Sequence, residues 1–237
     1  MNTILQINKL TLGYSSKKEE DILAEDITVS AQEGQLIALM GLNGTGKTTL
    51  FKTILQEIKP ISGEIVVNGE RLDQLNISKT MSVVFTERIH LFGFTVFDLV
   101  AMGRMPHTNS FGKLKKEDIE IVNKCISLLG LEQIQDFQVE KLSDGQFQKV
   151  MIAKSLAQET PLLLLDEPTA FLDVRNKDII YNLLREITKN LGKTIIVSTH
   201  NIEFCKEYCD SFWLLQNNKL TENEAKSISK STFQFTS

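Results

Sequence analysis

The sequence predicts an α/β fold, in which a parallel sheet with crossover helices carries an inserted helical subdomain. Two observations predict it. Compact apolar runs with the character of buried strands recur along the chain with helical stretches between them, an alternation typical of parallel sheets. From about residue 95 to residue 157 the pattern changes to helical periods without a convincing strand. The 237 residues, of which 42% are hydrophobic and 24% charged, suffice for one large domain.

The first part of the chain predicts two short strands ahead of a buried one. A partly alternating run predicts a strand over Ile4–Leu12, a polar loop lies around Ser15–Asp21, and a short strand follows near Ile27–Val29. Gln35–Met40 is a compact apolar run that ends at a glycine, which favours a buried strand. Thr45–Ile58 carries apolar residues at helical spacing and stops before a proline, so it predicts a helix.

Further strands are predicted on both sides of the helical block. Glu64–Val67 lies between two turn signals, and Thr80–Phe85 is another apolar run. Strand signals resume at Leu162–Leu165, Thr194–Ser198 and Phe212–Leu215, with helical stretches between them.

These patterns predict the domain organisation. We expect one domain over residues 1–216, with the helical subdomain at about 88–157. From Gln216 the chain is polar and rich in Ser, Lys and Asn, so we expect residues 217–237 to form a poorly ordered tail.

The strongest motif is a glycine-rich loop between the buried strand and the helix that follows it. It fits the pattern GxxxxGK[ST], and its residues are Gly41, Leu42, Asn43, Gly44, Thr45, Gly46, Lys47 and Thr48. Glycines let successive backbone N–H groups point at phosphate oxygens, and the helix that begins near Gly46 adds its positive end. Lys47 supplies a mobile cation for the outer phosphates, and the Thr48 hydroxyl can ligate Mg²⁺. The motif therefore predicts a nucleotide phosphate site.

Two carboxylates follow another apolar run. Leu162–Leu165 is followed by Asp166 and Glu167, which places both acids at the C-terminal edge of a strand. In an open parallel sheet this edge is where ligands bind. Asp166 can hold Mg²⁺ through its water shell, and Glu167 can orient or deprotonate an attacking water. The alternative is that the two acids only cap the next helix.

A third motif, Leu142–Gln146, lies just ahead of an amphipathic stretch, Phe147–Ala157. By itself the motif indicates a helix start. Either Ser143 or Asp144 can cap the exposed N–H groups there, and we expect Asp144 to turn back and cap the helix, because its charge suits the helix dipole.

In this order and spacing, the three motifs resemble the ATP-binding cassette (ABC) family over about residues 4–215. Residues 41–48 match its Walker A loop, 162–167 its Walker B strand with the catalytic glutamate, and 142–146 its signature, usually written LSGGQ. The resemblance implies a RecA-like P-loop lobe, a helical subdomain and an antiparallel β portion near the N-terminus. It also implies ATP and Mg²⁺ as ligands and ATP hydrolysis as the activity.

The resemblance implies roles for further residues. Tyr14 matches the aromatic that stacks on adenine, although a strand-end core aromatic is the alternative. Thr49 follows the Walker A loop and is expected to bind the nucleotide with it. Asp173 is the last residue of the segment that matches the D-loop, and it too is expected at the nucleotide. His200, just past a predicted strand, matches the switch histidine that contacts the γ-phosphate, where a helix-capping histidine is the alternative.

The family works as a head-to-tail homodimer with two ATP molecules at the interface. The resemblance implies that each ATP site is built from two chains. One chain supplies Lys47, Thr48, Asp166, Glu167 and His200, and its partner supplies Ser143, Gly145 and Gln146.

A narrower resemblance involves Thr95–His107, with Ala157-Gln158 and Thr160-Pro161 ahead of the Walker B strand. These stretches are similar to those of ATPase subunits of iron-siderophore, haem and cobalamin importers. Such importers pair two ATPase chains with two integral membrane permease chains and an external substrate-binding protein. This resemblance implies a peripheral position at the cytoplasmic face of the membrane. The rivals are a soluble cassette ATPase that moves no solute, such as an iron–sulfur assembly ATPase, and a non-catalytic nucleotide-binding regulator.

The sequence departs from the family pattern at functional positions. Asp144 stands where the signature has glycine, and Lys149 stands where arginine is common. Thr86-Glu87 stands where the family places its Q-loop glutamine, which reaches Mg²⁺ and links the nucleotide to the helical subdomain. We expect one of these two residues to take the place of the glutamine, with Thr86 slightly favoured over Glu87 by alignment. The alternative is that neither residue touches the metal and water fills the position.

Composition restricts the partners. The net charge of −4 gives no indication of a nucleic-acid surface. No segment approaches the roughly 18 apolar residues that a membrane span needs, and the N-terminus does not match a secretion signal, so we expect a soluble cytoplasmic chain. The odd number of cysteines, Cys125, Cys205 and Cys209, predicts reduced packing thiols rather than a metal site.

Overall fold

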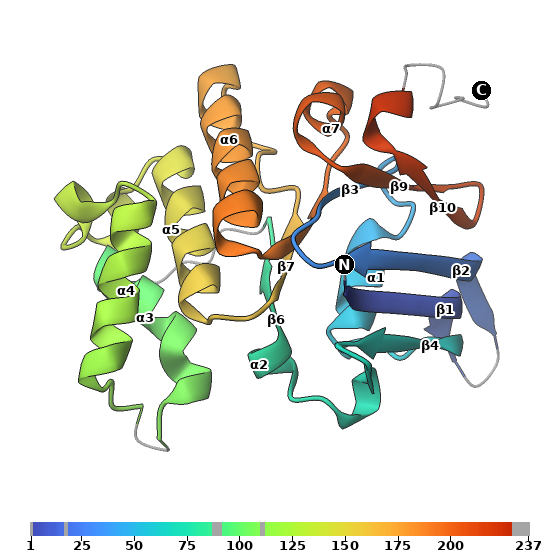
Figure 1. The fold of residues 1–237 in the computed structure, drawn as a ribbon, viewed down its shortest axis with the longest axis horizontal. Coiled ribbons are helices and arrows are strands. Elements are labelled where there is room, and N and C mark those ends of the chain that lie inside the picture. Colours follow the sequence, from blue (N-terminus) through green and yellow to red (C-terminus); the bar gives the residue numbers. More distant parts are fainter. Residues whose placement is uncertain (1, 17–18, 87–91, 110–111, 229–237) are drawn as a thin grey trace.

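The computed structural model describes residues 2–16, 19–86, 92–109 and 112–228. Its main layer is a six-stranded sheet in the order β10-β9-β3-β8-β7-β6 (Figure 1). The strands are β3 (Leu36–Met40), β6 (Met81–Val84), β7 (Leu162–Asp166), β8 (Thr194–Ser198), β9 (Ser211–Gln216) and β10 (Lys219–Glu224). Because β9, β3, β8, β7 and β6 pair in parallel, their carboxyl ends meet at one edge, as the sequence predicts.

A second, antiparallel sheet has the order β2-β1-β4-β5. Its strands are β1 (Thr3–Ser15), β2 (Glu20–Gln32), β4 (Ser62–Val67) and β5 (Glu70–Arg71). The first two are longer than the alternation predicts, since they form one long hairpin that takes in both ends of the expected loop at 15–21. This sheet and one face of the main sheet enclose a core around Leu50, Phe51 and Ile54 of α1 (Lys47–Ile54).

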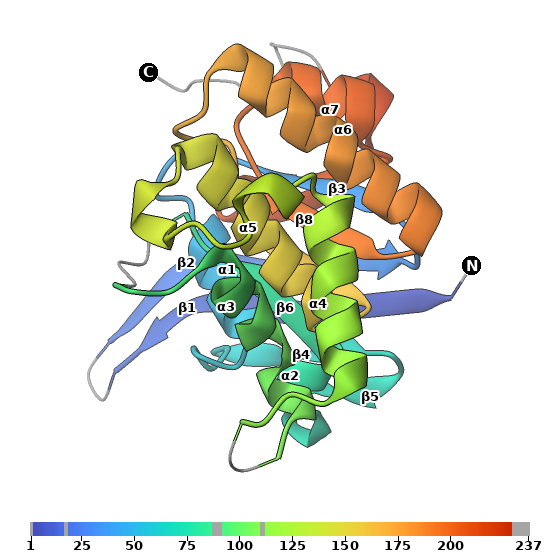
Figure 2. The same ribbon diagram turned by 90° about the vertical axis from the view of Figure 1, so that its left-hand side faces the viewer.

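The remaining helices divide between the sheet and a separate subdomain. Those that pack with the main sheet are α2 (Ile77–Thr80), α6 (Val174–Leu191) and α7 (Ile202–Tyr208). The subdomain contains α3 (Val96–Ala101), α4 (Lys116–Leu128) and α5 (Asp144–Ala157), which lie side by side in Figure 2. Short 3₁₀ turns complete the chain at Leu72–Gln74, Met102–His107, Glu132–Ile134, Val139–Lys141 and Ala225–Ser227. The predicted helical block between residues 95 and 157 is confirmed across its described part.

The expectation of a poorly ordered tail after Gln216 is wrong as far as residue 228. Strand β10 pairs with β9 across a turn in which Asn217 and Asn218 have φ values of 52° and 58°. Two successive left-handed residues make the type I′ turn of a tight hairpin, and asparagine is one of the few residues that tolerate it. Leu220 and Ile228 are buried, so this polar segment still contributes to the core. Residues 229–237 lie outside the described part of the chain.

A charged cluster centred on the buried Arg104 joins three parts of the helical subdomain. Arg104 is 4% exposed, and its Nε donates to Asp118 Oδ1 at 3.0 Å. Its Nη1 donates to the carbonyl oxygen of Ala157 and to Glu159 Oε2, both at 2.7 Å. Arg104 therefore joins the 3₁₀ turn at Met102–His107, the first turn of α4 and the C-terminal end of α5.

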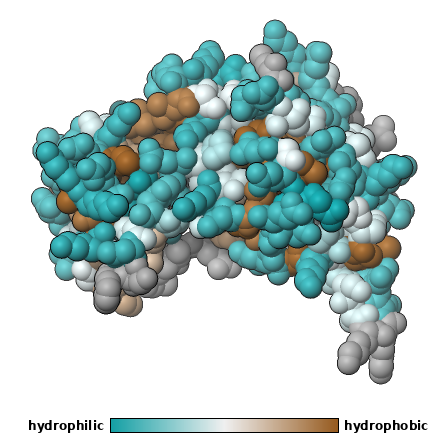
Figure 3. Space-filling view, turned by 60° about the horizontal axis from the view of Figure 1, so that its bottom comes forward, coloured by the Kyte–Doolittle hydropathy of each residue, from teal (hydrophilic) through white to brown (hydrophobic). Residues whose placement is uncertain are grey.

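The surface offers little apolar area on the side viewed in Figure 3, where hydrophilic residues dominate and hydrophobic ones form small separate patches. Within the described ranges, no helix combines the length and apolar character needed to cross a membrane. Cys125 and Cys205 are buried and Cys209 is half-buried, and all three are free thiols.

Candidate active site

The glycine loop joins β3 to α1 and has the backbone geometry that its sequence predicts. A side chain at Gly41 could not fit, because its Cβ would lie 2.6 Å from the carbonyl oxygen of Leu215. Gly44 and Gly46 have φ values of 82° and 105°, which L side chains rarely adopt. Gly46 is the N-cap of α1 and has no side chain to satisfy the first N–H groups of the helix. These donors are therefore open to an anion such as phosphate.

Lys47 is folded back into this loop. Its Nζ donates to the carbonyl oxygens of Gly41 at 2.9 Å and Leu42 at 3.0 Å, and the residue is 7% exposed. Burial lowers the pKa of Lys47, while the nearby charges of Glu167 and Asp166 act to raise it. The ammonium group thus lies beside the loop with neutral partners that a phosphate can displace.

Asp166 lies at the carboxyl end of β7, where two hydroxyls hold its carboxylate. Thr48 Oγ1 donates to Asp166 Oδ2 at 2.7 Å, and Ser198 Oγ donates to Asp166 Oδ1. Thr48 belongs to α1 and Ser198 to β8, so three elements meet at this carboxylate. Thr48 and Asp166, which the sequence predicts as Mg²⁺ ligands, are thus in direct contact, and Ser198 is a partner that sequence reasoning missed.

Glu167 is placed by an unusual backbone conformation. Its φ of 46° lies in the left-handed region that non-glycine residues rarely adopt. The turn brings Glu167 Oε2 to 3.2 Å from Nδ1 of His200, whose side chain is 68% exposed. The family resemblance implies that both residues belong to the site of one chain, and the structure brings them into contact.

Tyr14 and Thr49 lie on the other side of the glycine loop. The Tyr14 hydroxyl is 3.2 Å from Thr49 Oγ1, and Tyr14 is 48% exposed. This exposure contradicts the alternative interpretation of Tyr14 as a core aromatic, and leaves its ring open to a ligand.

Most of these residues share one hollow of about 410 Å³. It is lined by Tyr14, Leu23, Asn43, Gly44, Gly46, Lys47, Thr48, Thr49, Thr86, Asp166 and Glu167. One wall therefore holds an aromatic ring, the floor holds backbone N–H groups and a cation, and the other wall holds carboxylates. A nucleotide triphosphate has matching chemistry: an aromatic base, an anionic phosphate chain and a bond that water can attack.

Thr86 lines this hollow and forms a hydrogen bond there. Its hydroxyl donates to the backbone carbonyl oxygen of Asp166 at 2.7 Å, so it touches the Walker B segment directly. Glu87, the other candidate for the Q-loop position, lies outside the described residues. His107 Nε2 is 2.9 Å from the carbonyl oxygen of Gln158, at the end of α5.

The signature residues do not line this hollow; they lie at the N-terminus of α5, where Asp144 lines a smaller neighbouring pocket with Thr86 and Glu167. Ser143 is the N-cap: its side chain accepts from the N–H of Gln146, and the Gln146 side chain accepts from the N–H of Ser143. The expectation that Asp144 caps this helix is wrong, because Ser143 already occupies the N-cap and Asp144 is the first helical residue. A serine three residues before a glutamine forms the reciprocal capping box, a signal that was readable in the sequence.

Asp173 caps a different helix. Its Oδ1 accepts from the N–H of Asn176 at 2.8 Å, at the start of α6. A Cβ at Gly145 would lie 3.1 Å from the Asn176 side chain, so the signature turn and the D-loop are neighbours.

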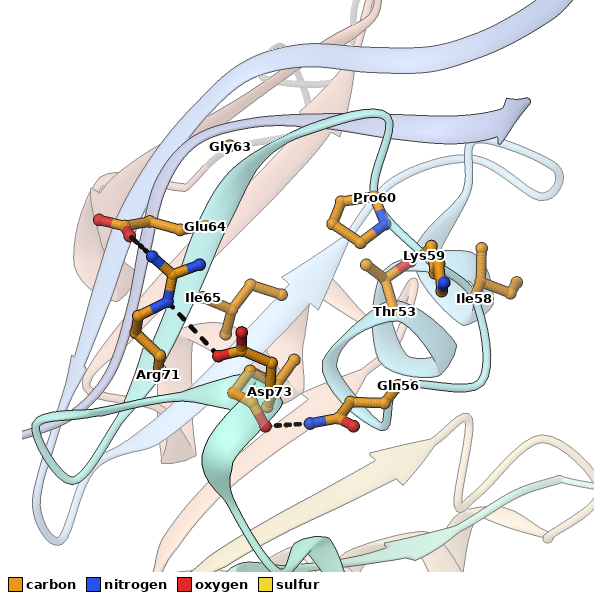
Figure 4. A pocket seen from close by; sticks show the side chains of 11 residues that line it. Thr53, Gln56, Ile58, Lys59, Pro60, Gly63, Glu64, Ile65, Arg71 and Asp73 are labelled. Atoms are coloured by element: carbon orange, nitrogen blue, oxygen red, sulfur yellow. Dashed lines mark hydrogen bonds and ion pairs between the residues drawn. The ribbon is translucent and has the colours of Figure 1, made fainter.

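A second hollow, of about 340 Å³, lies between the C-terminal end of α1 and the β4–β5 hairpin (Figure 4). Arg71 lies there between Glu64 and Asp73, with both of which it forms ion pairs. The hollow is lined by none of the residues that the sequence singled out, and three of its charged residues, Glu64, Arg71 and Asp73, are paired with one another.

The structure combines a glycine-rich phosphate loop, which follows β3 and contains a lysine, with two carboxylates at the end of β7, two strands away in the same parallel sheet. This combination defines a P-loop nucleoside triphosphate hydrolase. The family model described as ABC transporter matches residues 24–170 of the chain. The chain belongs to this family as an ATP-binding, ATP-hydrolysing subunit.

Curated relatives agree with this assignment. An uncharacterized ABC transporter ATP-binding protein of Methanocaldococcus jannaschii is 36% identical, with 92% of this chain and 74% of the relative covered. The iron(3+)-hydroxamate import ATP-binding protein FhuC of Bacillus subtilis is 34% identical, with coverage of 86% and 76%. The ferric enterobactin transport ATP-binding protein FepC of Escherichia coli is 33% identical, with coverage of 93% and 81%.

Solved structures agree as well. An inward-facing transporter assigned to the metal-chelate type has a TM-score of 0.86 and 29% identity, with 98% of this chain and 87% of that chain covered. The dimeric structure of MJ0796, described as a bacterial ABC transporter cassette, has a TM-score of 0.81 at 23% identity, with coverage of 95% and 100%, and supports the fold.

Proposed function

We propose that this chain energises the import of a metal chelate of the iron-siderophore, haem or cobalamin class through a separate membrane permease. The observation that carries the hydrolytic part is the convergence of Lys47, Asp166, Glu167 and His200 at one sheet edge. The names of the relatives support the cargo class, since FhuC and FepC serve iron(3+)-hydroxamate and ferric enterobactin. In this role the chain lies at the cytoplasmic face of the membrane and is held there by the permease, which works with an external substrate-binding protein.

Each residue of the hollow has a definite task in this proposal. The first N–H groups of α1 bind phosphate oxygens, and Lys47 exchanges its carbonyl partners for the outer phosphates. Tyr14 stacks on the adenine. Glu167 accepts a proton from the attacking water, while His200, in contact with Glu167, orients the γ-phosphate.

The residues around Thr48 fit Mg²⁺. A hydroxyl and a carboxylate oxygen 2.7 Å apart are hard oxygen donors, which this cation prefers. When bound, Mg²⁺ neutralises charge on the outer phosphates. Thr48 would ligate it directly and Asp166 would hold it through water.

We propose that a second copy of the chain completes the site, head to tail. Ser143, Gly145 and Gln146 do not line the hollow of their own chain. They lie at the start of α5, whose N-terminus suits a γ-phosphate. Asp173, at the start of α6 beside Gly145, lies where the two chains would meet.

We also propose that Thr86 takes the place of the Q-loop glutamine. Its hydroxyl gives its proton to the carbonyl oxygen of Asp166, which leaves oxygen lone pairs for Mg²⁺ or its water. Alanine at residues 86 and 87, singly and together, tests this in permease-stimulated ATPase assays. Loss of stimulation in Thr86→Ala supports the proposal. Unchanged stimulation in both single variants and in the double variant contradicts it.

Copurification and uptake test the transport function. The tagged chain should copurify from membranes with a polytopic protein, and vesicles that contain both should take up an iron-labelled hydroxamate or catecholate chelate, haem or cobalamin when ATP is supplied on the cassette side. The same vesicles with Lys47→Ala should take up none. If the chain hydrolyses ATP but copurifies with no membrane protein and supports no uptake, the result would favour the alternative of a soluble cassette ATPase that moves no solute.

A further inference from the structure

Ser198 is the residue of the active edge that no motif names. It ends β8, directly beside Asp166 at the end of β7, and the two are paired in the register of the parallel strands. Side chains of paired residues in neighbouring parallel strands point to the same face of the sheet. The register thus places the Ser198 hydroxyl beside the Asp166 carboxylate.

The Ser198 hydroxyl makes two hydrogen bonds. It donates to Asp166 Oδ1, and it accepts from the backbone N–H of Glu167 at 2.8 Å. A serine hydroxyl has one proton to donate and lone pairs to accept, so both partners can be satisfied at once. Ser198 is fully buried, which excludes water as a competitor for either bond.

The second bond matters because the Glu167 backbone is in a costly conformation. A φ of 46° at a non-glycine residue persists only where neighbouring contacts hold it. Among the residues that the structure describes, the N–H of Glu167 has Ser198 as its partner, through the hydroxyl at 2.8 Å and the carbonyl oxygen at 3.2 Å. This conformation is what brings the Glu167 carboxylate to His200.

We infer that Ser198 is a positioning residue for ATP hydrolysis, whose hydroxyl fixes the Asp166 carboxylate and the Glu167 backbone relative to each other. Thr48 holds the other oxygen of Asp166, so the carboxylate is fixed from both sides. Ser198 acts through these two residues and does not touch the nucleotide hollow itself. The inference rests on ATP hydrolysis by this chain and is independent of the cargo.

The test is the steady-state ATPase activity of Ser198→Ala. Loss of a buried hydrogen bond to a charged group predicts a fall in kcat of about tenfold or more. The KM for ATP should stay within about twofold of wild type, because the binding residues of the glycine loop are untouched. A kcat within about twofold of wild type overturns the inference. A wild-type chain without ATPase activity would instead overturn the hydrolytic function.

Ser82→Ala is the matched control. Ser82 is 3% exposed on β6, and its hydroxyl accepts from Thr160 Oγ1 at 3.0 Å, at the opposite end of the same sheet. The change removes the same atom from the same kind of site, so kcat should stay within about twofold of wild type. If kcat falls equally in both variants, the loss of any buried hydroxyl in this sheet is enough to lower activity through the structure. That result would contradict the inference.

The Glu167→Gln background separates positioning from folding. If Ser198 acts by positioning the base, Ser198→Ala should lower the residual kcat of Glu167→Gln by less than about twofold, since the base is already lost. A full tenfold additional fall would show that Ser198 acts independently of Glu167 and would contradict its role in positioning the base.

Two further variants keep the test valid if Ser198→Ala fails to fold. Ser198→Thr keeps the hydroxyl, whereas Ser198→Cys keeps the approximate volume but has a weak donor and a weak acceptor. The expected order of kcat is wild type, then Ser198→Thr, then Ser198→Cys. Activity of Ser198→Cys equal to or above that of Ser198→Thr would contradict the role of the hydroxyl.

Discussion

Lys47 and Asp166 at the sheet edge and Arg104 and Asp118 at the base of the helical subdomain are all buried, but the two sets of charges have different partners. At the edge, Lys47 bonds to two backbone carbonyls, and Asp166 bonds to the hydroxyls of Thr48 and Ser198. At the base of the subdomain, Arg104 bonds directly to the carboxylates of Asp118 and Glu159.

This difference separates a binding site from a structural junction. Charges held by neutral partners keep their capacity to pair with incoming ions, here phosphates and a divalent cation. Charges already paired in the interior serve architecture, and removal of one partner leaves the other buried and uncompensated. Variants of the edge should therefore reduce activity while the fold survives, and variants of the junction should reduce stability first.

The largest effect on ATP binding is expected from Lys47→Ala. It removes the only charge that the glycine loop brings to the phosphates, and should weaken ATP binding by about 100-fold. Equilibrium binding of a fluorescent ATP analogue measures this. The melting temperature without nucleotide should change little, because the lost bonds go to carbonyls at the mouth of the hollow. Unfolding of the variant, with affinity intact in the folded fraction, would contradict the comparison.

The second effect is on stability, at the junction. Arg104→Met keeps most of the side-chain volume but leaves Asp118 buried without its cation, which should cost about 3–5 kcal/mol of the free energy of unfolding. Denaturant titration measures it, with Arg71→Met as the control, because Arg71 forms its ion pairs on the exposed surface. An equal loss of unfolding free energy in the two variants would contradict a stabilising role of the buried ion pair beyond that of an exposed one.

The junction also predicts a pH dependence. The backbone N–H of Lys115, and after it the guanidinium of Arg104, lower the pKa of Asp118 below its usual value. A group whose pKa is lower in the folded state stabilises the fold above its unfolded pKa, and that stability is lost as the pH falls through the folded value. The stability difference between wild type and Arg104→Met should thus persist at pH 5 to 7 and shrink only in stronger acid. A difference that vanishes already near pH 6 would contradict this assignment.

The smallest effect is expected from Asp144→Gly, which restores the usual signature residue. Asp144 is the first residue of α5, where a carboxylate suits the helix dipole and glycine is a poor helix former, so the change should cost about 1 kcal/mol of stability. ATP affinity of the monomer should hardly change, because Asp144 does not line the nucleotide hollow. Thermal melting and ATP titration measure the two quantities. A large gain in ATP affinity would place Asp144 against the nucleotide.

The sequence predicted those parts of the site in which residue type and backbone position are tied together. The glycine loop, Asp166 and Glu167 were predictable because a loop after a buried strand and two acids at a strand end both lie at the same edge of a parallel sheet. Ser198 was not, because its role depends on the register of β7 and β8, which no local pattern specifies.

Two errors have the same origin in local chemistry. Polar composition suggested a disordered end after Gln216, yet the Asn217-Asn218 turn folds that segment back as β10. Charge favoured Asp144 as the cap of α5, yet the reciprocal bonds of Ser143 and Gln146 take that position. In both places a specific turn or cap outweighed the average property of the segment.

The central claim is that this chain hydrolyses ATP in a dimer whose base is Glu167. Its most direct test is Glu167→Gln, measured for turnover and for its mass in solution with ATP and Mg²⁺. The account predicts a fall in turnover of about 100-fold or more, because the amide cannot accept the proton, together with a stable ATP-dependent dimer. Near wild-type turnover, or a variant that stays monomeric at saturating ATP, would contradict it.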